Sequence, residues 1–363
     1  MANVEIASHF IDADGVRTHY LEAGEGPPLV LVHGGGAGAD SLGNWQDCFP
    51  ILTRHFRVIA PDMIGFGRTD KPSPDDYTYD QPGRNRHMAA FLDAMGLSGV
   101  AIVGNSMGGA TAIGVALDRP ELIGTLVLMG SAGLPIPERP SPHLLQNLHY
   151  DFTMEGMRRV IGGLTAPGFV PSEAMVRYRY DLVDDEASRA ALAAINAETR
   201  KGTLNYDEDR LRTIHQPTLV VNGKEDGVSI LPRAYRFLEL LPNSWGYIVP
   251  HCGHWAMIEA TEDFCGAVLR FLKVADVTAP AGVHAMIEHL VRHPAERGYA
   301  KSDPDALFDR FAVDPAAREV LRTGSRDALS GLGMHGNYVI KWLIWSGRPT
   351  LPFFAMSHFF DRR

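Results

Sequence analysis

Cysteine is scarce in this chain of 363 residues, and long apolar runs are missing. The three cysteines, Cys48, Cys252 and Cys265, lie far apart, show no metal-ligand spacing and cannot all pair with one another. No run approaches the roughly 18 apolar residues of a membrane span, and the N-terminus lacks the basic start and apolar core of a secretion signal. We therefore expect a soluble cytoplasmic protein with no disulfide framework and no membrane partner.

Positive charge is also in short supply, with 34 Lys and Arg against 43 Asp and Glu and a formal net charge of -9. No lysine and arginine block could neutralise phosphates, so we expect no nucleic-acid partner. Nucleotide-binding motifs are missing too. The glycine-rich stretch H-G-G-G at residues 33–36 could be interpreted as a phosphate-binding loop, but it lacks the G-K-[S/T] of a P-loop and the G-x-G-x-x-G of a dinucleotide site. The composition is that of an ordinary globular protein, long enough for one large domain and one small one.

The most informative stretch that is present runs from Val100 to Asp118. An apolar strand at 100–103 leads into G-N-S-M-G-G at 104–109, and a helix follows over 110–118. So sharp a turn strains its middle residue, Ser106, and glycines two residues before and after it prevent collisions. The Ser106 hydroxyl should then project beside the positive end of the helix dipole. The pattern predicts a nucleophile elbow, and a tight glycine turn before a helix is the alternative.

Short β-branched runs alternate with helical patterns on both sides of this turn. We expect strands at residues 16–22, 29–32, 56–60, 100–103, 123–129, 218–222 and 245–249, and helices near 45–52, 84–95, 110–118, 233–241 and 261–274. Because the strand runs are continuously apolar, they favour a mostly parallel sheet covered on both faces, an α/β fold. Residues 134–212 show only helical patterns and predict a cap over the carboxyl ends of the strands.

A serine becomes a good nucleophile only beside a base, and two candidate partners follow strands of the predicted sheet. Asp226 comes after the strand at 218–222, and His254 comes after the strand at 245–249. The chain order serine, acid, histidine suits a hydrolase triad in which Asp226 fixes the imidazole tautomer. The neighbours of these two residues in the sequence remain as alternatives, Glu225 for the acid and His251 for the base.

An attacked carbonyl also needs hydrogen-bond donors for its developing negative charge. The backbone N–H of Met107 is one candidate because it directly follows the serine. We choose Gly35, in H-G-G-G, as the other.

Three motifs identify a family resemblance over residues 1–275: H-G-G-G-A-G-A at 33–39, G-N-S-M-G-G-A at 104–110 and C-G-H-W-A at 252–256. This region resembles the meta-cleavage product hydrolases, enzymes of the α/β-hydrolase fold that cut a carbon–carbon bond in 2-hydroxy-6-oxohexa-2,4-dienoates during bacterial aromatic degradation. The resemblance implies a Ser106–His254–Asp226 triad, prior ketonisation of the dienol and no cofactor or metal. It also implies substrate contacts from Gly34, Asn44, Asn105, Trp255 and Arg179.

Arg179, in V-R-Y-R-Y of the cap, matches the arginine that pairs with the substrate carboxylate in that family. An arginine suits a planar carboxylate because its guanidinium can donate two parallel hydrogen bonds. Arg177 is a near alternative. The substituent at C6 of the substrate is not determined by the sequence.

The chain changes character after a linker expected at 276–282. Residues 283–363 are predicted to be helical, with acid–proline caps at Asp303 and Asp314 and an apolar helix over 337–345. This tail resembles the small subunit of protocatechuate 4,5-dioxygenase-type extradiol dioxygenases, through residues 311–319 and G-M-H-G-N at 333–337. The resemblance implies docking to a dioxygenase large subunit and no metal site in the tail. Its many aromatic residues also suit self-association, and we expect a homo-oligomer.

Three hypotheses about function follow. The first is a carbon–carbon hydrolase acting on a dienoate. The second is a carboxylesterase or lactonase of the same fold, because a triad alone does not specify the bond that is broken. The third is a dioxygenase-associated partner protein that acts mainly through its C-terminal domain. The intact set of Ser106, Asp226 and His254 favours an enzyme.

Overall fold

The computed structural model describes residues 4–135, 142–275, 281–332, 334 and 336–348. Residues 276–280 of the expected linker, Gly333 and His335 of the G-M-H-G-N motif, and the aromatic stretch from Phe353 to Phe360 lie outside the described residues. The chain divides after Phe271 into two compact units, which are described separately below.

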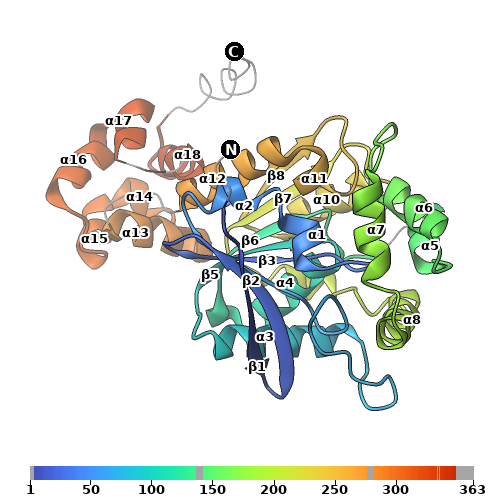
Figure 1. Cartoon of the computed structure of the whole chain (residues 1–363). Coiled ribbons are helices and arrows are strands. Elements are labelled where there is room, and N and C mark those ends of the chain that lie inside the picture. Colours follow the sequence, from blue (N-terminus) through green and yellow to red (C-terminus); the bar gives the residue numbers. More distant parts are fainter. Residues whose placement is uncertain (1–3, 136–141, 276–280, 333, 335, 349–363) are drawn as a thin grey trace. The chain divides into compact units, whose positions relative to one another are not determined.

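The first unit contains an eight-stranded sheet in the order β1-β2-β4-β3-β5-β6-β7-β8 (Figure 1). The antiparallel edge consists of β1 (Ala7–Ala13) and β2 (Val16–Ala23), and β2 also pairs antiparallel with β4. The remaining pairs are parallel and join β3 (Pro28–Val32), β4 (Arg57–Pro61), β5 (Val100–Asn105), β6 (Ile123–Met129), β7 (Thr218–Gly223) and β8 (Ser244–Val249). The predicted fold class, a mostly parallel sheet with helices, is confirmed.

Two details of the prediction need correction. The edge strand β1 was not expected, because most of its residues are at least partly exposed and give no buried apolar run. The single helix expected near 45–52 is two short helices, α1 (Ser41–Trp45) and α2 (Phe49–Leu52). Pro50 lies in the first turn of α2, where its missing N–H costs nothing, and this position favours a new helix start over continuation of α1.

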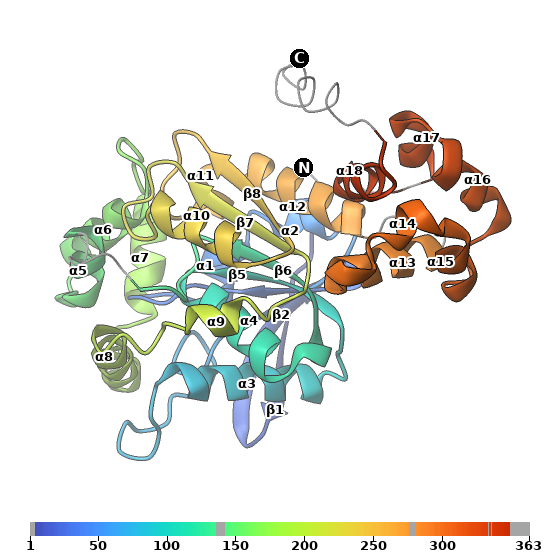
Figure 2. The same cartoon turned by 180° about the vertical axis from the view of Figure 1, so that it is seen from behind.

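Helices cover both faces of the sheet, with α3 (Gln81–Ala94) and α4 (Met107–Asp118) on one face and α12 (Thr261–Ala275) on the other (Figures 1 and 2). Along β3, Val30 and Val32 join the core cluster that includes α3 and α4. Leu29 and Leu31 alternate with them and are also completely buried. Burial of both faces explains why the strand runs are continuously apolar. The other helices of this unit outside the cap are η1 (Pro120–Leu122), α10 (Leu231–Leu240) and α11 (Ala256–Glu259).

The cap lies between β6 and β7, and its described part has only helices as regular elements. They are α5 (Pro142–Leu148), α6 (Met154–Leu164), α7 (Glu173–Asp181), α8 (Glu186–Arg200) and α9 (Glu208–Leu211). Side-chain oxygens of Thr153, Ser172 and Asp185 accept hydrogen bonds from the first-turn N–H groups of α6, α7 and α8. Such caps fix where each helix begins. The cap helices α5 to α8 gather at one end of the sheet, whereas α9 lies beside α4 (Figure 2).

The second unit is helical throughout its described residues, with its own apolar core. Its elements are α13 (Ala281–Arg292), η2 (Pro294–Glu296), α14 (Tyr299–Ser302), α15 (Pro304–Arg310), α16 (Pro315–Thr323), α17 (Arg326–Gly331) and α18 (Gly336–Trp345). Asp303 and Asp314 cap α15 and α16 as predicted. Trp342 of α18 is buried, and its indole N–H donates to the Leu321 carbonyl at 2.8 Å. Across the described parts of the chain, no helix is long and apolar enough to span a bilayer.

Candidate active site

The turn between β5 and α4 has the geometry expected of a nucleophile elbow. Ser106 has a φ of 53° and a ψ of -114°, a conformation that non-glycine residues rarely adopt. A Cβ at Gly104 would lie 2.4 Å from the Gly108 carbonyl oxygen, and one at Gly108 would lie 2.4 Å from the carbonyl oxygens of Val32 and His33. Both glycines are therefore required for β3, β5 and α4 to approach so closely.

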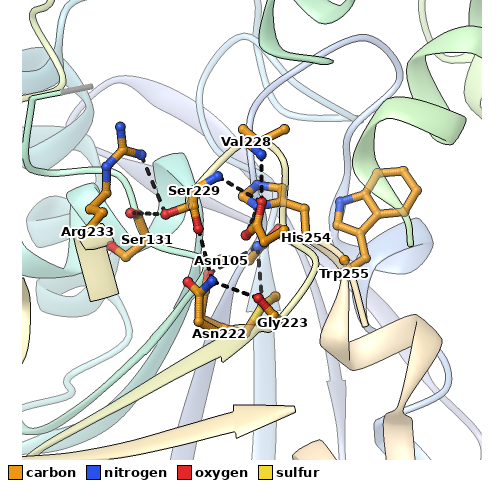
Figure 3. Close-up of polar contacts among 12 residues, drawn as sticks. Asn105, Ser131, Asn222, Gly223, Val228, Ser229, Arg233, His254 and Trp255 are labelled. Carbon is orange, nitrogen blue, oxygen red and sulfur yellow. Dashed lines mark hydrogen bonds and ion pairs between the residues drawn. The ribbon is translucent and has the colours of Figure 1, made fainter. Parts of the chain in front are cut away.

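Asp226 and His254 form a buried pair at the carboxyl ends of β7 and β8. The Nδ1 atom of His254 lies 2.8 Å from Oδ2 of Asp226, and the two side chains are 2% and 0% exposed. The other carboxylate oxygen accepts the backbone N–H groups of Val228 at 2.7 Å and Ser229 at 2.8 Å (Figure 3). Because an ionised carboxylate only accepts hydrogen bonds, Nδ1 carries the proton and Nε2 is left as the basic nitrogen.

The two sequence alternatives pair with each other at the surface. The His251 side chain is 93% exposed, and its Nδ1 lies 3.5 Å from a carboxylate oxygen of Glu225, which is 38% exposed. Neither is held by the buried hydrogen bonds that fix Asp226. The geometry therefore favours Asp226 and His254 as the acid and base.

The elbow is attached to the end of β6 beside this pair. The Ser106 N–H donates to the Met129 carbonyl at 3.0 Å, and the Ala132 N–H donates to the Ser106 carbonyl at 2.9 Å. Between them, a Cβ at Gly130 would lie 2.9 Å from His254 Nδ1. Among the described residues the Ser106 hydroxyl makes no hydrogen bond with His254. Catalytic hydrogen bonds are often long in ligand-free enzymes and shorten when substrate binds.

Gly35, one of the two proposed oxyanion donors, packs against the side chain of the other, Met107. A Cβ at Gly35 would lie 2.5 Å from the Met107 side chain, so the H-G-G-G loop passes directly over the start of α4. His33 fixes the loop, because its Nε2 accepts the Met63 N–H at 2.9 Å and its Nδ1 donates to the Gly34 carbonyl at 2.7 Å. Burial lowers the pKa of His33, which keeps the ring neutral. Sequence reasoning assigned this histidine no role.

The predicted polar contacts Gly34, Asn44 and Asn105 form one group. The Asn44 amide donates to Asn105 Oδ1 at 3.1 Å, and the Asn105 amide donates to the Met129 carbonyl at 3.2 Å. A Cβ at Gly34 would lie 2.7 Å from Asn105 Oδ1. The backbone of Gly34 thus comes close to the amide pair at the base of the elbow.

Arg179 enters the core from the cap helix α7. It is 2% exposed, its Nη2 donates to the Ala37 carbonyl at 2.9 Å, and its guanidinium carbon lies 4.6 Å from the centre of the Trp255 ring. Its Nε and Nη1 atoms are buried and have no hydrogen-bond partner among the described residues. Burial lowers its pKa to about 10, so it remains charged at neutral pH. The alternative, Arg177, is exposed and lies 4.0 Å from Asp181. A buried cation with free donors is suited to an anionic ligand.

Sequence reasoning missed Glu259 at the end of α11. Its carboxylate accepts the N–H groups of Gly253 at 3.1 Å and Trp255 at 3.2 Å, on either side of His254, and that of Ala166 in the cap at 2.6 Å. It therefore ties the histidine loop to the cap. Because its partners are backbone groups, no side-chain motif signals this role.

The Glu259→Gln variant is expected to unfold more easily than wild type by roughly 1–3 kcal/mol, because an amide offers one acceptor oxygen to three N–H groups. Urea unfolding followed by circular dichroism measures this difference. The control is Glu262→Gln, at an exposed position in the first turn of α12. Equal unfolding free energies for the two variants would refute the stabilising role of Glu259.

The buried carboxyl of Asp40 is expected to make the stability of the fold depend on pH. Burial and the nearby charge of Asp62 raise the pKa of Asp40 from its ordinary value of 3.8 to about 6. A carboxyl whose pKa is raised by folding contributes stability below its unfolded pKa and loses it as the pH rises through the folded value. We expect wild type to lose about 2 kcal/mol relative to Asp40→Asn between pH 4 and pH 7. Unfolding of both proteins at several pH values tests this, and a difference that does not vary with pH contradicts it.

Comparisons with known proteins place these observations in a family. A family profile described as alpha/beta hydrolase fold matches residues 27–261. A 2-hydroxy-6-oxo-6-(2'-aminophenyl)hexa-2,4-dienoic acid hydrolase from Metapseudomonas resinovorans is 52% identical over 275 residues, which are 75% of this chain and 93% of the relative. A 2-hydroxymuconate semialdehyde hydrolase from Pseudomonas sp. (strain CF600) is 31% identical over 74% of this chain and 95% of its own length.

Comparison with solved structures indicates the same family. A serine hydrolase involved in carbazole degradation (CarC enzyme) is 50% identical, with a TM-score of 0.68 over 74% of this chain and 100% of that one. A meta-cleavage product hydrolase from Pseudomonas fluorescens IP01 (CumD) is 32% identical, with a TM-score of 0.70 over 74% of this chain and 98% of that one. The chain therefore belongs to the meta-cleavage product hydrolases of the α/β-hydrolase fold.

Proposed function

We propose that the first unit hydrolyses the carbon–carbon bond beside the C6 carbonyl of a 2-hydroxy-6-oxohexa-2,4-dienoate. The observation that carries this proposal is the buried Arg179, whose Nε and Nη1 have no hydrogen-bond partner within the part of the chain that the structure describes. A carboxylesterase has no need of a buried cation in its acyl site, whereas a dienoate brings a carboxylate that satisfies both donors. The names of the curated relatives support the same substrate class.

The reaction begins with the substrate carboxylate on Arg179, and Gly34, Asn44, Asn105 and Trp255 line the dienoate. Ketonisation moves the proton of the C2 hydroxyl to C5 and creates an electron sink. His254 Nε2 then takes the Ser106 proton as the serine oxygen attacks the C6 carbonyl, and Asp226 stabilises the imidazolium that forms. The N–H groups of Gly35 and Met107 bind the oxyanion.

Collapse of this intermediate breaks the C5–C6 bond. The bonding electrons enter the ketonised fragment as a stabilised carbanion. This fragment takes the proton held by His254 and leaves as a five-carbon hydroxydienoate, so His254 is neutral again. The acyl group remains on Ser106. A water molecule deprotonated by His254 then releases the second acid and restores the serine.

A panel of ring-fission products tests this function. The panel contains aryl, alkyl and carboxyalkyl substituents at C6, and each reaction is followed by loss of the yellow dienolate absorbance. Simple p-nitrophenyl esters serve as the comparison. We expect kcat/KM for the best dienoate to exceed that for the best ester by at least about 100-fold, which corresponds to binding of the carboxylate. A preference for esters would favour the carboxylesterase alternative.

The proposed domain organisation is a hydrolase in residues 1–275, a linker at 276–282 and a dioxygenase-docking module in residues 283–363. Within the described part of the module, Tyr299 is 51% exposed and Ile344 is 49% exposed. Exposed large apolar side chains support an interface, and the resemblance to a dioxygenase small subunit supports a large subunit as the partner.

The three cysteines are free and buried, which supports a reduced compartment, the cytoplasm.

Truncation after Val274 is expected to keep hydrolase turnover within about threefold of wild type, because every proposed catalytic residue precedes that point. The truncated chain should fail to co-purify with a dioxygenase large subunit that retains the full-length chain. Solution masses of both chains report self-association, the competing role of the tail. Equal retention of both chains, or a soluble monomeric tail, would overturn the docking proposal.

A further inference from the structure

One hydrogen bond joins the cap to the core next to the arginine. The Tyr178 hydroxyl, on α7, donates to Oδ2 of Asp40 at 2.5 Å. The two residues are 138 positions apart in the sequence. Asp40 is 6% exposed, so its carboxylate is largely shielded from water, whereas Tyr178 is half-buried. A hydrogen bond to a buried carboxylate is among the stronger kinds in proteins.

On the core side, Asp40 controls where α1 begins. Its Oδ1 accepts the Gly43 N–H at 2.7 Å and caps the helix that carries Asn44. The Ser41 N–H donates to Asp62 Oδ1 at 2.8 Å, which fixes the same turn from β4. Asp40 therefore has one oxygen on the core helix and the other on the cap.

On the cap side, the residue after Tyr178 is Arg179. The backbone of Arg179 packs directly on the H-G-G-G loop, because a Cβ at Gly38 would lie 2.1 Å from the Arg179 carbonyl oxygen. Its guanidinium also donates to the Ala37 carbonyl. The position of the α7 backbone therefore determines how far Arg179 lies from the glycine-rich loop.

Packing beside this contact is incomplete. A cavity of about 310 Å³ opens between α1, α7 and α11, and its lining includes Gly43, Gln46, Met175, Tyr178 and Arg179. Side chains around a cavity lack partners on one side, so they resist displacement weakly. Tyr178 lines this cavity, so its hydrogen bond to Asp40 is a contact of α7 with the core at a place where packing is incomplete.

We propose that the Tyr178–Asp40 hydrogen bond is a positioning contact that holds Arg179 and Asn44 at the separation required by the substrate carboxylate. This inference rests on the proposed function of Arg179. The charged and titratable groups that face Asp40 are Tyr178 and Arg179 on the cap and Asp62 on the core. Among the described residues the guanidinium of Arg179 has a single hydrogen-bond partner, the Ala37 carbonyl, so we expect its position to depend on the neighbouring Tyr178–Asp40 contact.

The test compares Tyr178→Phe with Tyr180→Phe in the full-length chain. Tyr180 lies on the same helix, but its hydroxyl donates to the exposed Asp184 at 3.3 Å and not to the core, which makes it a matched control. Hydrogen–deuterium exchange of the α7 peptide, without substrate, reports whether the helix is held. We expect exchange to rise about tenfold or more in Tyr178→Phe and to be unchanged in Tyr180→Phe.

Kinetics supply the second measurement. For Tyr178→Phe we expect the KM for a dienoate to rise about tenfold with kcat within about threefold, and the KM for a p-nitrophenyl ester to be unchanged. Unchanged α7 exchange overturns the proposal whatever the substrate is. Equal losses on dienoate and ester also overturn it and indicate a role in cap folding alone. Absence of dienoate turnover in wild type refutes the proposed function instead, and the exchange result still decides whether the contact holds α7.

Discussion

The Ser106→Ala variant is expected to turn over a dienoate roughly 10⁴ to 10⁶ times more slowly than wild type, with its fold and substrate binding intact. In the proposed mechanism the acyl intermediate forms on this serine. His254 and Asp226 cannot compensate, because a base without its nucleophile contributes little and the members of a triad act as a unit. Single-turnover kinetics measure the loss, and equilibrium binding of the dienoate shows that the site is preserved.

The control for this variant is Ser131→Ala. Ser131 is buried near the elbow, but its hydroxyl donates to the Ala132 carbonyl and takes no part in the proposed chemistry. Its turnover should remain within about tenfold of wild type, since only one neutral hydrogen bond is lost. Turnover of Ser106→Ala within tenfold of wild type would move the chemistry to another residue.

Arg179→Ala is expected to lower kcat/KM for dienoates about 30- to 1,000-fold, the equivalent of about 2–4 kcal/mol for a buried charged pair. The loss should be expressed mainly in KM, because the carboxylate is bound in the ground state as well as in the transition state. Hydrolysis of p-nitrophenyl esters should fall far less. Steady-state kinetics on both substrate types measure the difference.

Arg177→Ala is the matched control for this second variant. Arg177 lies two residues earlier on α7 with a largely exposed side chain, so its removal should leave both activities within about threefold. If Arg179→Ala lowered ester and dienoate hydrolysis equally, its role would be to fold the cap and not to bind a carboxylate.

The elbow was predictable from sequence because its constraints are local. Gly104 and Gly108 are required by backbone atoms within the turn and in the neighbouring strand β3, so a short motif records the whole geometry. Asp226 and His254 were predictable for a related reason, since each follows a parallel strand of the sheet, β7 and β8. Parallel strands bring their carboxyl ends to one edge of the sheet, and position in the chain then implies position in space.

Contacts between distant segments were not predictable in this way. Glu259 binds backbone N–H groups, which every non-proline residue offers, so its partners leave no trace in the sequence. The Tyr178–Asp40 bond joins the cap to the core over 138 positions of the sequence, and the motifs quoted for this family assign neither side chain a role. Such contacts depend on how the cap packs on the sheet.

The two arginines of α7 illustrate a further limit. Residues two apart on a helix are rotated by roughly 200° about its axis, so their side chains project from nearly opposite sides. Only one of Arg177 and Arg179 can therefore face the core. The polar helix α7 has no strong apolar stripe to indicate which face is buried, because Val176 is its only other buried residue. The packed structure makes the choice and buries Arg179.

The central claim, hydrolysis of a carbon–carbon bond, is tested most directly by identifying both products of a dienoate reaction run in H₂¹⁸O. The account predicts equal amounts of two acids. One is the five-carbon hydroxydienoate without ¹⁸O, and the other is the acid derived from C6 with one ¹⁸O in its new carboxylate, because water releases the acyl group from Ser106. Loss of the yellow absorbance without formation of both acids would contradict the claim.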